Sequence, residues 1–584
     1  MITAVRSPCD EGVIRSRPAS APCTPDVGRW VLVGTILGSS MAFIDGSVVN
    51  VALPALQADL HASATDLQWI MEAYLLFLAA LMLVGGALGD RFGRRRVFAM
   101  GIALFTVASI AGGVALNVDQ LISARAIQGV GGALLVPGSL AIISASFRNE
   151  QRGQAIATWV GFTSIIAAVG PLLGGWFVQY ASWRWVFFIN VPLAVVVLGV
   201  VLWRVPESCD EDSQGGLDWW GALLTIVGLG AIVYGLIEAG SLGVSDPLVL
   251  VALAVGIVAL GAFLLVEATL QAPMVPLSLF RSLTFSGVNL QTLLLYAALG
   301  GITFFFPFDL MQVQGYSPTA AGAALVPFLL LVFLFSRLTE GLVDRFGSKL
   351  PLVVGPVITA VGFVLFAVPT IGGTYWVTFL PAVLLMGIGM AINVAPMATV
   401  VMGAVEQRHA DIASAINNAV ARAAGLLAIA VLGIVIVSVF NSSLDSHLAH
   451  LQLSPSLRHL IEAQRGKLAG MQLPVSGSAE AQAALKQAVA ESFVSGFRLV
   501  ALLCAGLALA SALCGWVMIK DKRAGRGVRA GKAPKTDKPL RAISAAASHR
   551  RSGLILWLLA LCKKGLDPLF PGDEIAPVER RTGA

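Results

Sequence analysis

The sequence GALGDRFGRRRV, from Gly86 to Val97, separates two long apolar stretches with a short, dense cluster of charges. An apolar stretch of about 18 or more residues crosses a bilayer as a helix, because lipid offers backbone N–H and C=O groups no other partner. Further apolar stretches follow one another along nearly the whole chain. The sequence therefore predicts an all-α polytopic membrane protein, in which the charged cluster is a loop between two spans.

The composition supports a membrane location. Hydrophobic residues make up 57% of the 584 residues and charged residues only 12%, where a soluble domain carries about 25%. A net charge of +6 would suggest nucleic acid in a soluble protein, but here the basic residues mark the ends of apolar stretches. They are expected to set the orientation of the spans, so no nucleic-acid partner is predicted. The six cysteines imply no disulfide framework, and no cleavable signal peptide is expected before the first span.

Apolar windows predict about fourteen spans. They begin near Arg29, Gln68, Val97, Leu121, Gln154, Arg184, Trp219, Pro247, Leu283, Thr319, Leu350, Tyr375, Asp411 and Ser492. An even number of spans places both chain ends on one side. The loops on that side carry Arg91, Arg94, Arg95, Arg96, Arg148, Arg152, Arg345, Lys349 and Arg408, and the short loops opposite carry only Arg184. By the positive-inside rule, both termini are predicted to be cytosolic.

The expected organisation has five parts. They are a cytosolic tail (1–28), a six-helix bundle (29–204), two linker helices (205–282), a second six-helix bundle (283–519) with an extracytoplasmic loop (441–491), and a basic cytosolic tail (520–584). That loop is far longer than the two to eight residues, roughly, that join neighbouring helices. We expect either two short helices packed on one another, one bearing the leucines from Leu448 to Leu460 and one running from Ala479 to Phe493, or unstructured filler.

The motif DRFG occurs twice, at Asp90–Gly93 and at Asp344–Gly347, each time between two spans at the predicted cytosolic face. Glycine permits a tight turn, and aspartate can cap or pair across helix ends. A single copy would be no more than a charged turn, but repetition at matching faces predicts two related halves. Duplicated bundles of this kind usually place a binding cavity between the halves near mid-membrane.

Three ionisable residues lie inside the first bundle: Asp45 in AFIDGSVVN, Glu72 in QWIMEAYLL and Arg125 in LISARAIQG. Each costs roughly 2.5 to 3.5 kcal/mol on insertion scales, so each needs a partner, an aqueous cavity or a neutral form. Burial and a neighbouring arginine tune the proton affinity of a carboxylate, which is the control that a proton-coupled carrier needs. Two interpretations stand. Either these residues couple protons or substrate to transport, or Arg125 neutralises a carboxylate and holds helices together.

Other features of the spans predict packing rather than chemistry. Arg422 lies deep in its span, where Asn417 and Asn418 are expected to solvate it in a structural role. The segment GPLLGG, from Gly170 to Gly175, is either a pivot or a tight helix seam, since proline removes a donor and glycines let helices touch. The tail segment GLILWLLALC, Gly553 to Cys562, is too short to span, and either lies in the membrane interface or is an incidental apolar patch.

Taken together, these segments resemble the major facilitator superfamily, and within it the fourteen-span drug:proton antiporter family, over Arg29 to Ile519. FIDGSVVNVALP (Phe43–Pro54) and WRWVFFINVP (Trp183–Pro192) resemble its first-span and sixth-span motifs. LISARAIQGVGGA matches its fourth-span motif, which implies a part in proton coupling for Arg125, with Gln128 beside it. The antiporter motif of exporters is matched by Gly170, Pro171, Gly174 and Gly175. One departure is Ile166, which stands where the motif has a further glycine and weakens the helix-bending role.

The resemblance also implies a conformational gate at the cytosolic face. It comprises Gly86, Asp90, Arg91, Gly93, Arg94 and Arg95, with Asp344 and Arg345 in the second copy. The residues expected to couple protons or to line the substrate cavity are Asp45, Glu72, Arg125 and Gln128.

We therefore expect a carrier of two six-helix bundles with two additional central helices, in the cell membrane. It would export hydrophobic or amphipathic small molecules in exchange for inward-moving protons, by alternating access. The expected partners are the substrate, protons and the lipid bilayer. No enzyme activity, cofactor, metal or ATP site is predicted, because GRGVRAGKA (Gly525–Ala533) lacks the spacing of a nucleotide loop. Two alternatives are a permease subunit working with a periplasmic adaptor, and a non-transporting sensor, against which Asp45, Arg125 and Asp90 argue.

Overall fold

The computed structural model describes residues 25–147, 149–209, 218–270, 273, 275–335, 347–406, 409–451, 455–472 and 479–519. Within these ranges every regular element is a helix. Fourteen helical segments of the described chain are long and apolar enough to cross a membrane, which confirms the predicted number of spans. The predicted gate residues Asp344 and Arg345, the chain before Pro25 and the tail after Ile519 lie outside the described residues.

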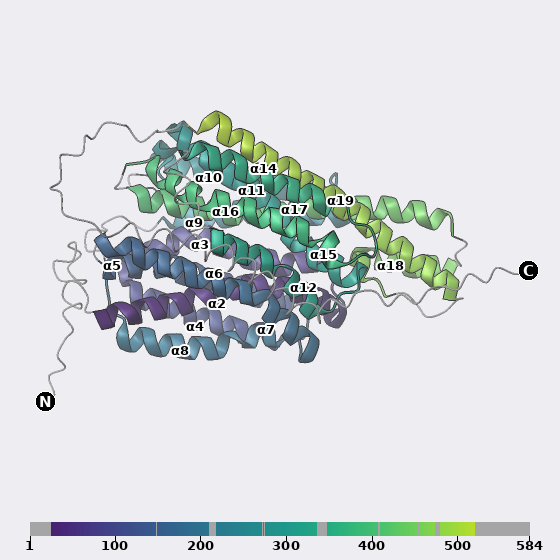
Figure 1. The fold of residues 1–584 in the computed structure, drawn as a ribbon, viewed down its shortest axis with the longest axis horizontal. Helices are drawn as coiled ribbons and strands as arrows, with labels where there is room; N and C mark the ends of the chain where they lie inside the picture. The colour runs from purple at the N-terminus through teal and green to yellow at the C-terminus, as the bar shows by residue number, and fades with distance from the viewer. Residues whose placement is uncertain are drawn as a thin grey trace, which may run out of the picture.

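The helices of the first half pack against one another as one bundle, seen in the lower part of Figure 1. They are α2 (Pro25–Leu60), α3 (Ala64–Phe92), α4 (Arg94–Gly113), α5 (Val118–Ser146), α6 (Asn149–Tyr180), α7 (Trp185–Phe188) and α8 (Asn190–Arg204). Polar side chains cap several spans where they begin, and so satisfy backbone N–H groups there. Ser63 and Asp66 form a reciprocal capping box on α3, and Asn117 caps α5.

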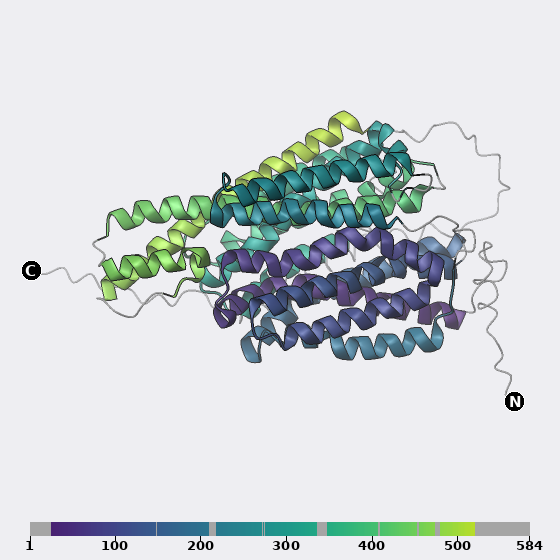
Figure 2. The same cartoon turned by 180° about the vertical axis from the view of Figure 1, so that it is seen from behind.

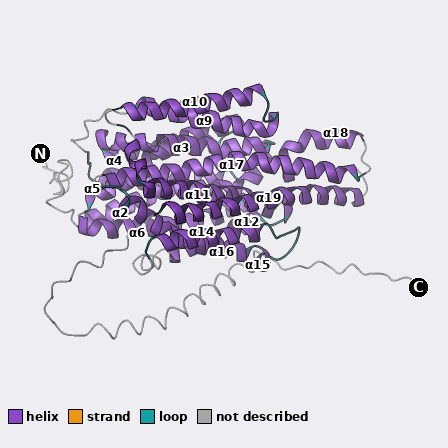
Figure 3. Ribbon diagram, turned by 90° about the horizontal axis from the view of Figure 1, so that it is seen from above, coloured by secondary structure: helices purple, strands orange, loops and turns teal. Residues whose placement is uncertain are grey.

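The second half forms the other bundle. It contains η1 (Leu277–Arg281), α11 (Leu283–Phe308), the π-helix η2 (Asp309–Val313), α12 (Pro318–Ala324), α14 (Lys349–Phe366), α15 (Tyr375–Thr378), α16 (Leu380–Gly403), α17 (Ala410–Ala449), α18 (Pro455–Gln464), η4 (Arg465–Gly470) and α19 (Ala479–Met518). Between the bundles in sequence are α9 (Trp219–Leu242) and α10 (Pro247–Thr269), which pair with each other. Figure 3 shows this pair along one edge of the molecule, where α9 packs against α3 and α17.

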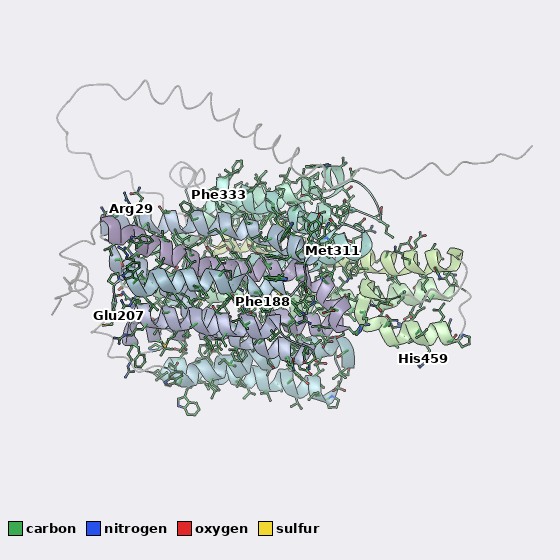
Figure 4. All side chains as sticks on the ribbon, turned by 90° about the horizontal axis from the view of Figure 1, so that it is seen from below. Arg29, Phe188, Glu207, Met311, Phe333 and His459 are labelled. Atoms are coloured by element: carbon green, nitrogen blue, oxygen red, sulfur yellow. The ribbon has the colours of Figure 1, made fainter. Side chains whose placement is uncertain are left out.

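The two ends of the molecule differ. We call the end where α2 begins and α19 finishes the terminal end, and the opposite end, which carries α18, the arm end. Figure 4 shows Arg29 and Glu207 at the terminal end and His459 far away at the arm end. At the arm end a single buried apolar cluster joins both bundles and includes Leu53, Met71 and Phe306.

Toward the terminal end each bundle has a core of its own. The first bundle buries a cluster that includes Phe98 and Ile143. The second buries a separate cluster that includes Phe285 and Met397. A smaller cluster of α3, α9 and α17 side chains ties the additional helix pair to the junction of the bundles. The bundles are therefore packed together over the arm end of the molecule and have separate cores at the terminal end.

The described residues 441–451, 455–472 and 479–491 form an outer arm at the arm end (Figure 2). The helices α17 and α19 each have 40 residues, and at 1.5 Å per residue each is about 60 Å long, twice the hydrocarbon thickness of a bilayer. The last span, predicted to begin near Ser492, is part of α19, which runs without a break from Ala479. The Ala-, Gln- and Glu-rich turns before Ser492 are not apolar but favour a helix, so they extend the helix beyond the apolar span.

The outer arm is thus two extended membrane helices with α18 and η4 between them, rather than a separate hairpin of two short helices. Leu448 is buried as predicted, whereas Leu460 is 45% exposed. The buried residue of α18 is its neighbour Ile461, which packs into the cluster shared by the two bundles.

Candidate functional site

The predicted residues Asp45, Arg125 and Gln128 meet inside the first bundle. The Arg125 guanidinium donates to the Asp45 carboxylate and, over 2.7 Å, to Gln128 Oε1, while Gln128 Nε2 donates to Asp45 Oδ1 over 2.7 Å. Arg125 Nε also donates to the carbonyl of Ile70 on α3, over 3.1 Å. Asp45 and Arg125 are fully buried and Gln128 is 1% exposed. A buried charge pair needs surrounding hydrogen bonds, and here α2, α3 and α5 supply them, while Arg125 Nη2 has no hydrogen-bond partner among the described residues.

Three further residues complete this cluster, and sequence reasoning did not single them out. Gln128 Nε2 donates to Ser109 Oγ over 2.8 Å, and Asn190 Nδ2 donates to the same oxygen over 3.1 Å and to Asp45 over 3.5 Å. The Tyr74 ring lies 4.3 Å from the centre of the Arg125 guanidinium. Ser109 and Asn190 are fully buried polar residues in otherwise apolar helices, which is the signal that could have identified them.

Glycines of α5 allow this cluster to form. A Cβ on Gly129 would lie 3.2 Å from the Tyr74 carbonyl carbon and closer still to its oxygen, and one on Gly131 would lie 2.6 Å from the Phe105 backbone nitrogen. The absence of side chains lets α5 touch α3 and α4 along their backbones. Arg125 and Gln128 lie within one turn of this contact. The segment RAIQGVGG therefore contains both the two polar side chains and the glycines that allow the close helix packing.

Glu72 lies apart from the cluster. It is fully buried, and neither carboxylate oxygen has a hydrogen-bond partner among the described residues. One turn on either side of it, Trp69 and Leu76 pack with Val233 of α9 and Leu426 of α17. Glu72 therefore belongs to the face of α3 that meets the additional helix pair and the second bundle, and the structure does not bring it to Asp45 or Arg125.

The loop between α3 and α4 is held at the terminal end by its own charges. Arg94 pairs with Asp90 over 2.7 Å, and Gly93 has φ +105°, which favours glycine. Glu207, which sequence reasoning missed, accepts a hydrogen bond of 2.9 Å from the Arg95 backbone N–H and lies within 3.6 Å of the Arg95 side chain. Arg91 is exposed and Gly86 half-buried. A charged network thus links this loop to the chain after α8.

The segment GPLLGG is a seam on two sides of α6. A Cβ on Gly174 would meet the Val48 backbone of α2, within the first bundle. A Cβ on Gly175 would lie 2.7 Å from the Pro318 carbonyl carbon at the start of α12. A Cβ on Gly322 of α12 would likewise lie 2.7 Å from the Pro171 carbonyl carbon of α6. Gly175 and Gly322 therefore permit backbone contact between the two bundles.

Arg422 is not solvated by its neighbouring asparagines, so that prediction is wrong. Asn417 donates to Asn289 and Thr292 of α11, and Asn418 donates to the Ser414 carbonyl of its own helix. The Arg422 guanidinium lies 5.9 Å from the Phe43 ring of α2, because the register of α17 turns it toward the other bundle.

Comparison with known proteins agrees with this architecture. The family model described as Major Facilitator Superfamily matches residues 35–429. The chain belongs to this superfamily. Its members are transporters and not enzymes, and with fourteen candidate spans the chain is a multi-pass membrane protein.

Relatives within the superfamily are similar over most of the chain. The tetracenomycin C resistance and export protein of Streptomyces glaucescens is 33% identical, covering 85% of this chain and 92% of its own. The multidrug resistance protein Stp of Mycobacterium tuberculosis is 33% identical over 74% of this chain and 80% of its own. A bacterial homologue of the human lysosomal transporter Spinster, solved in an inward-facing, unoccupied conformation, shares the fold with a TM-score of 0.60 at 16% identity, covering 85% of this chain and 98% of that one.

Proposed function

We propose that this protein is a proton-coupled antiporter that exports hydrophobic or amphipathic small molecules across the cell membrane. The relatives support export of such compounds, since they include a tetracenomycin C resistance and export protein and a puromycin resistance protein. The second of these, from Streptomyces alboniger, is 36% identical over 73% of this chain and 86% of its own.

The buried cluster of Asp45, Arg125 and Gln128 is the observation that carries this proposal. A proton that binds an Asp45 oxygen removes the negative charge that faces Arg125, while Arg125 keeps its hydrogen bonds to Gln128 and to the Ile70 carbonyl. Asp45 lies on α2 and Arg125 on α5, so protonation weakens a link between two helices of the first bundle. In this mechanism proton uptake and release at Asp45 change how the first bundle packs.

The arrangement of the cores supports alternating access. The bundles share one apolar cluster at the arm end and have separate clusters at the terminal end. This is the packing expected of a state that is closed at the arm end. The basic residues Arg94, Arg95 and Lys349 lie at the terminal end, so by the positive-inside rule we assign that end, with both termini, to the cytosol. Substrate would then enter from the cytosol in this state.

The test uses the full chain in proteoliposomes with an imposed pH gradient and an amphipathic fluorescent dye, ethidium. We expect dye transport that stops when an uncoupler collapses the gradient. Asp45→Asn should abolish gradient-driven transport by the folded protein, because an amide of the same size cannot exchange a proton. Asp119→Asn, at an exposed position on α5, is the matched control and should transport normally. Transport by Asp45→Asn that still responds to the gradient would remove Asp45 from the mechanism, and no transport by the unmodified protein would favour a non-transporting role.

A further inference from the structure

Arg422 is a cation near the middle of the membrane-spanning part of the molecule. It lies about 18 Å along α17 from the first residue, Ala410, at 1.5 Å per residue, which is more than half of a hydrocarbon layer about 30 Å thick. It is half-buried. A lipid phosphate belongs to the bilayer surface, so it is not a partner at this depth.

Side chains from both bundles surround Arg422. Its guanidinium lies 5.9 Å from the ring of Phe43 on α2. It is also near enough to the hydroxyl groups of Tyr74 on α3 and Tyr296 on α11 for its charge to act on both. Phe43 and Tyr296 are themselves half-buried. Arg422 thus lies at the junction of the bundles, next to the Phe43 ring of the other bundle, which is not fully enclosed.

No carboxylate of the described residues pairs with Arg422. Asp45, two residues after Phe43, is bound by Arg125. Glu72 has no hydrogen-bond partner among the described residues, and so is not bound to Arg422 either. An arginine at this depth without a protein carboxylate is costly, and such residues usually mark a substrate or ion pathway.

We propose that Arg422 binds an anionic group, a carboxylate or similar oxyanion, on an aromatic amphipathic substrate. The guanidinium matches a carboxylate with two parallel hydrogen bonds, and the ring of Phe43 provides an apolar surface for the aromatic part. This inference rests on the proposed function for the nature of the compound, since it makes the anion part of the exported molecule.

The experiment measures equilibrium binding to the purified full chain in nanodiscs of phosphatidylcholine, with no proton gradient. The probes are naphthaleneacetate and naphthaleneacetamide, which share a ring system and differ in charge. We expect the unmodified protein to prefer the carboxylate. Arg422→Gln should weaken carboxylate binding by about tenfold or more and leave amide binding nearly unchanged, because only the charged hydrogen bonds are lost. Arg422→Lys, which keeps the charge but not the planar fork, should fall in between.

Asn418→Ala is the matched control on the same helix, because Asn418 is exposed and bonds only within α17. It should preserve the preference for the carboxylate. Equal affinity of the unmodified protein for both probes would overturn the proposal, as would an equal loss of both in Arg422→Gln. If Arg422→Gln does not fold, the test rests on Arg422→Lys. A carboxylate preference in Arg422→Lys as strong as that of the unmodified protein would contradict binding through the two parallel guanidinium hydrogen bonds. Failure of proton-driven ethidium transport is a separate result, because the binding measurement needs no gradient.

Discussion

At the scale of single residues, the two buried carboxylates of the first bundle have opposite surroundings. Asp45 is held by Arg125, Gln128 and Asn190, whereas Glu72 has no hydrogen-bond partner among the described residues. Asp45 thus has a charged partner on another helix, whereas Glu72 has only apolar neighbours on the face of α3 that meets α9 and α17. The two residues are therefore suited to different tasks, although both were predicted from the same signal.

Glu72→Gln should change transport without removing the Asp45 cluster. Because Glu72 lies between α3, α9 and α17, we expect either a shifted pH optimum or a reduced preference for cationic compounds, since a carboxyl group among apolar side chains attracts a proton or a positive charge. The measurement is initial transport rates of ethidium and of a neutral dye over a pH series in proteoliposomes. Unchanged rates for both dyes at every pH would exclude a transport role for Glu72.

The sequence was sufficient to select Asp45, Arg125 and Gln128, because charged residues in apolar spans are rare and a motif carried two of them. It could not select Ser109 or Tyr74, which are ordinary helix residues until three-dimensional packing brings them to the cluster. Arg422 was misread for the same reason. Asn417 and Asn418 are its neighbours in sequence, but the helix turns their side chains to α11 and to their own backbone.

At the scale of elements, the contact of α6 with α12 brings backbone atoms of the two bundles close together. Gly175 and Gly322 each face a carbonyl of the opposite helix, and Gln179 accepts a hydrogen bond from the Thr319 backbone N–H over 3.3 Å. The GPLLGG segment therefore lets α6 and α12 meet backbone to backbone at the arm end, which larger side chains would prevent by separating the helices.

Gly175→Ala should therefore weaken closure at the arm end. The added methyl group would clash with the Pro318 carbonyl, so α6 and α12 must move apart. We expect spin labels placed on the arm-end surfaces of α6 and α12 to show longer distances, and efflux to slow. Gly199→Ala on α8, where a methyl group would meet nothing within 4 Å, is the control. Equal spin-label distances in Gly175→Ala and in the control Gly199→Ala would show that this contact does not hold the arm end closed.

At the scale of the whole molecule, the number of spans followed from the lengths of the apolar stretches, whereas the outer arm did not. Hydropathy defines where a helix must enter lipid, but not how far it continues in water. The arm also enters the junction of the bundles. Gln57 of α2 donates to the Lys467 carbonyl of η4 over 3.0 Å, and Gln312 of η2 donates to Gln57 over 2.7 Å. Leu468, buried against the shared core, has a φ of +52° that is unusual for a leucine.

From this geometry we expect the outer arm to help close the arm end. Lys467 and Leu468 cover a cavity of about 20 Å³, room for about one water molecule, that is also lined by residues of both bundles. Replacing residues 455–472 with a Gly/Ser linker of equal length removes this cover while α17 and α19 remain. Because the arm-end-closed state loses the contacts of Lys467 and Leu468 with both bundles, that state should become less populated.

We expect the linker variant to insert normally, to export ethidium from cells more slowly, and to expose the arm end to a membrane-impermeant thiol reagent. The readout of exposure is a single cysteine at position 304, Phe304→Cys, placed in a background from which the native cysteines have been removed, since Phe304 lines the covered cavity. The control replaces only Arg458 and His459 with serine, because both are exposed on α18 and do not touch that cavity. Full export and an unreactive cysteine in the linker variant, at equal membrane abundance, would show that the arm is dispensable for closure.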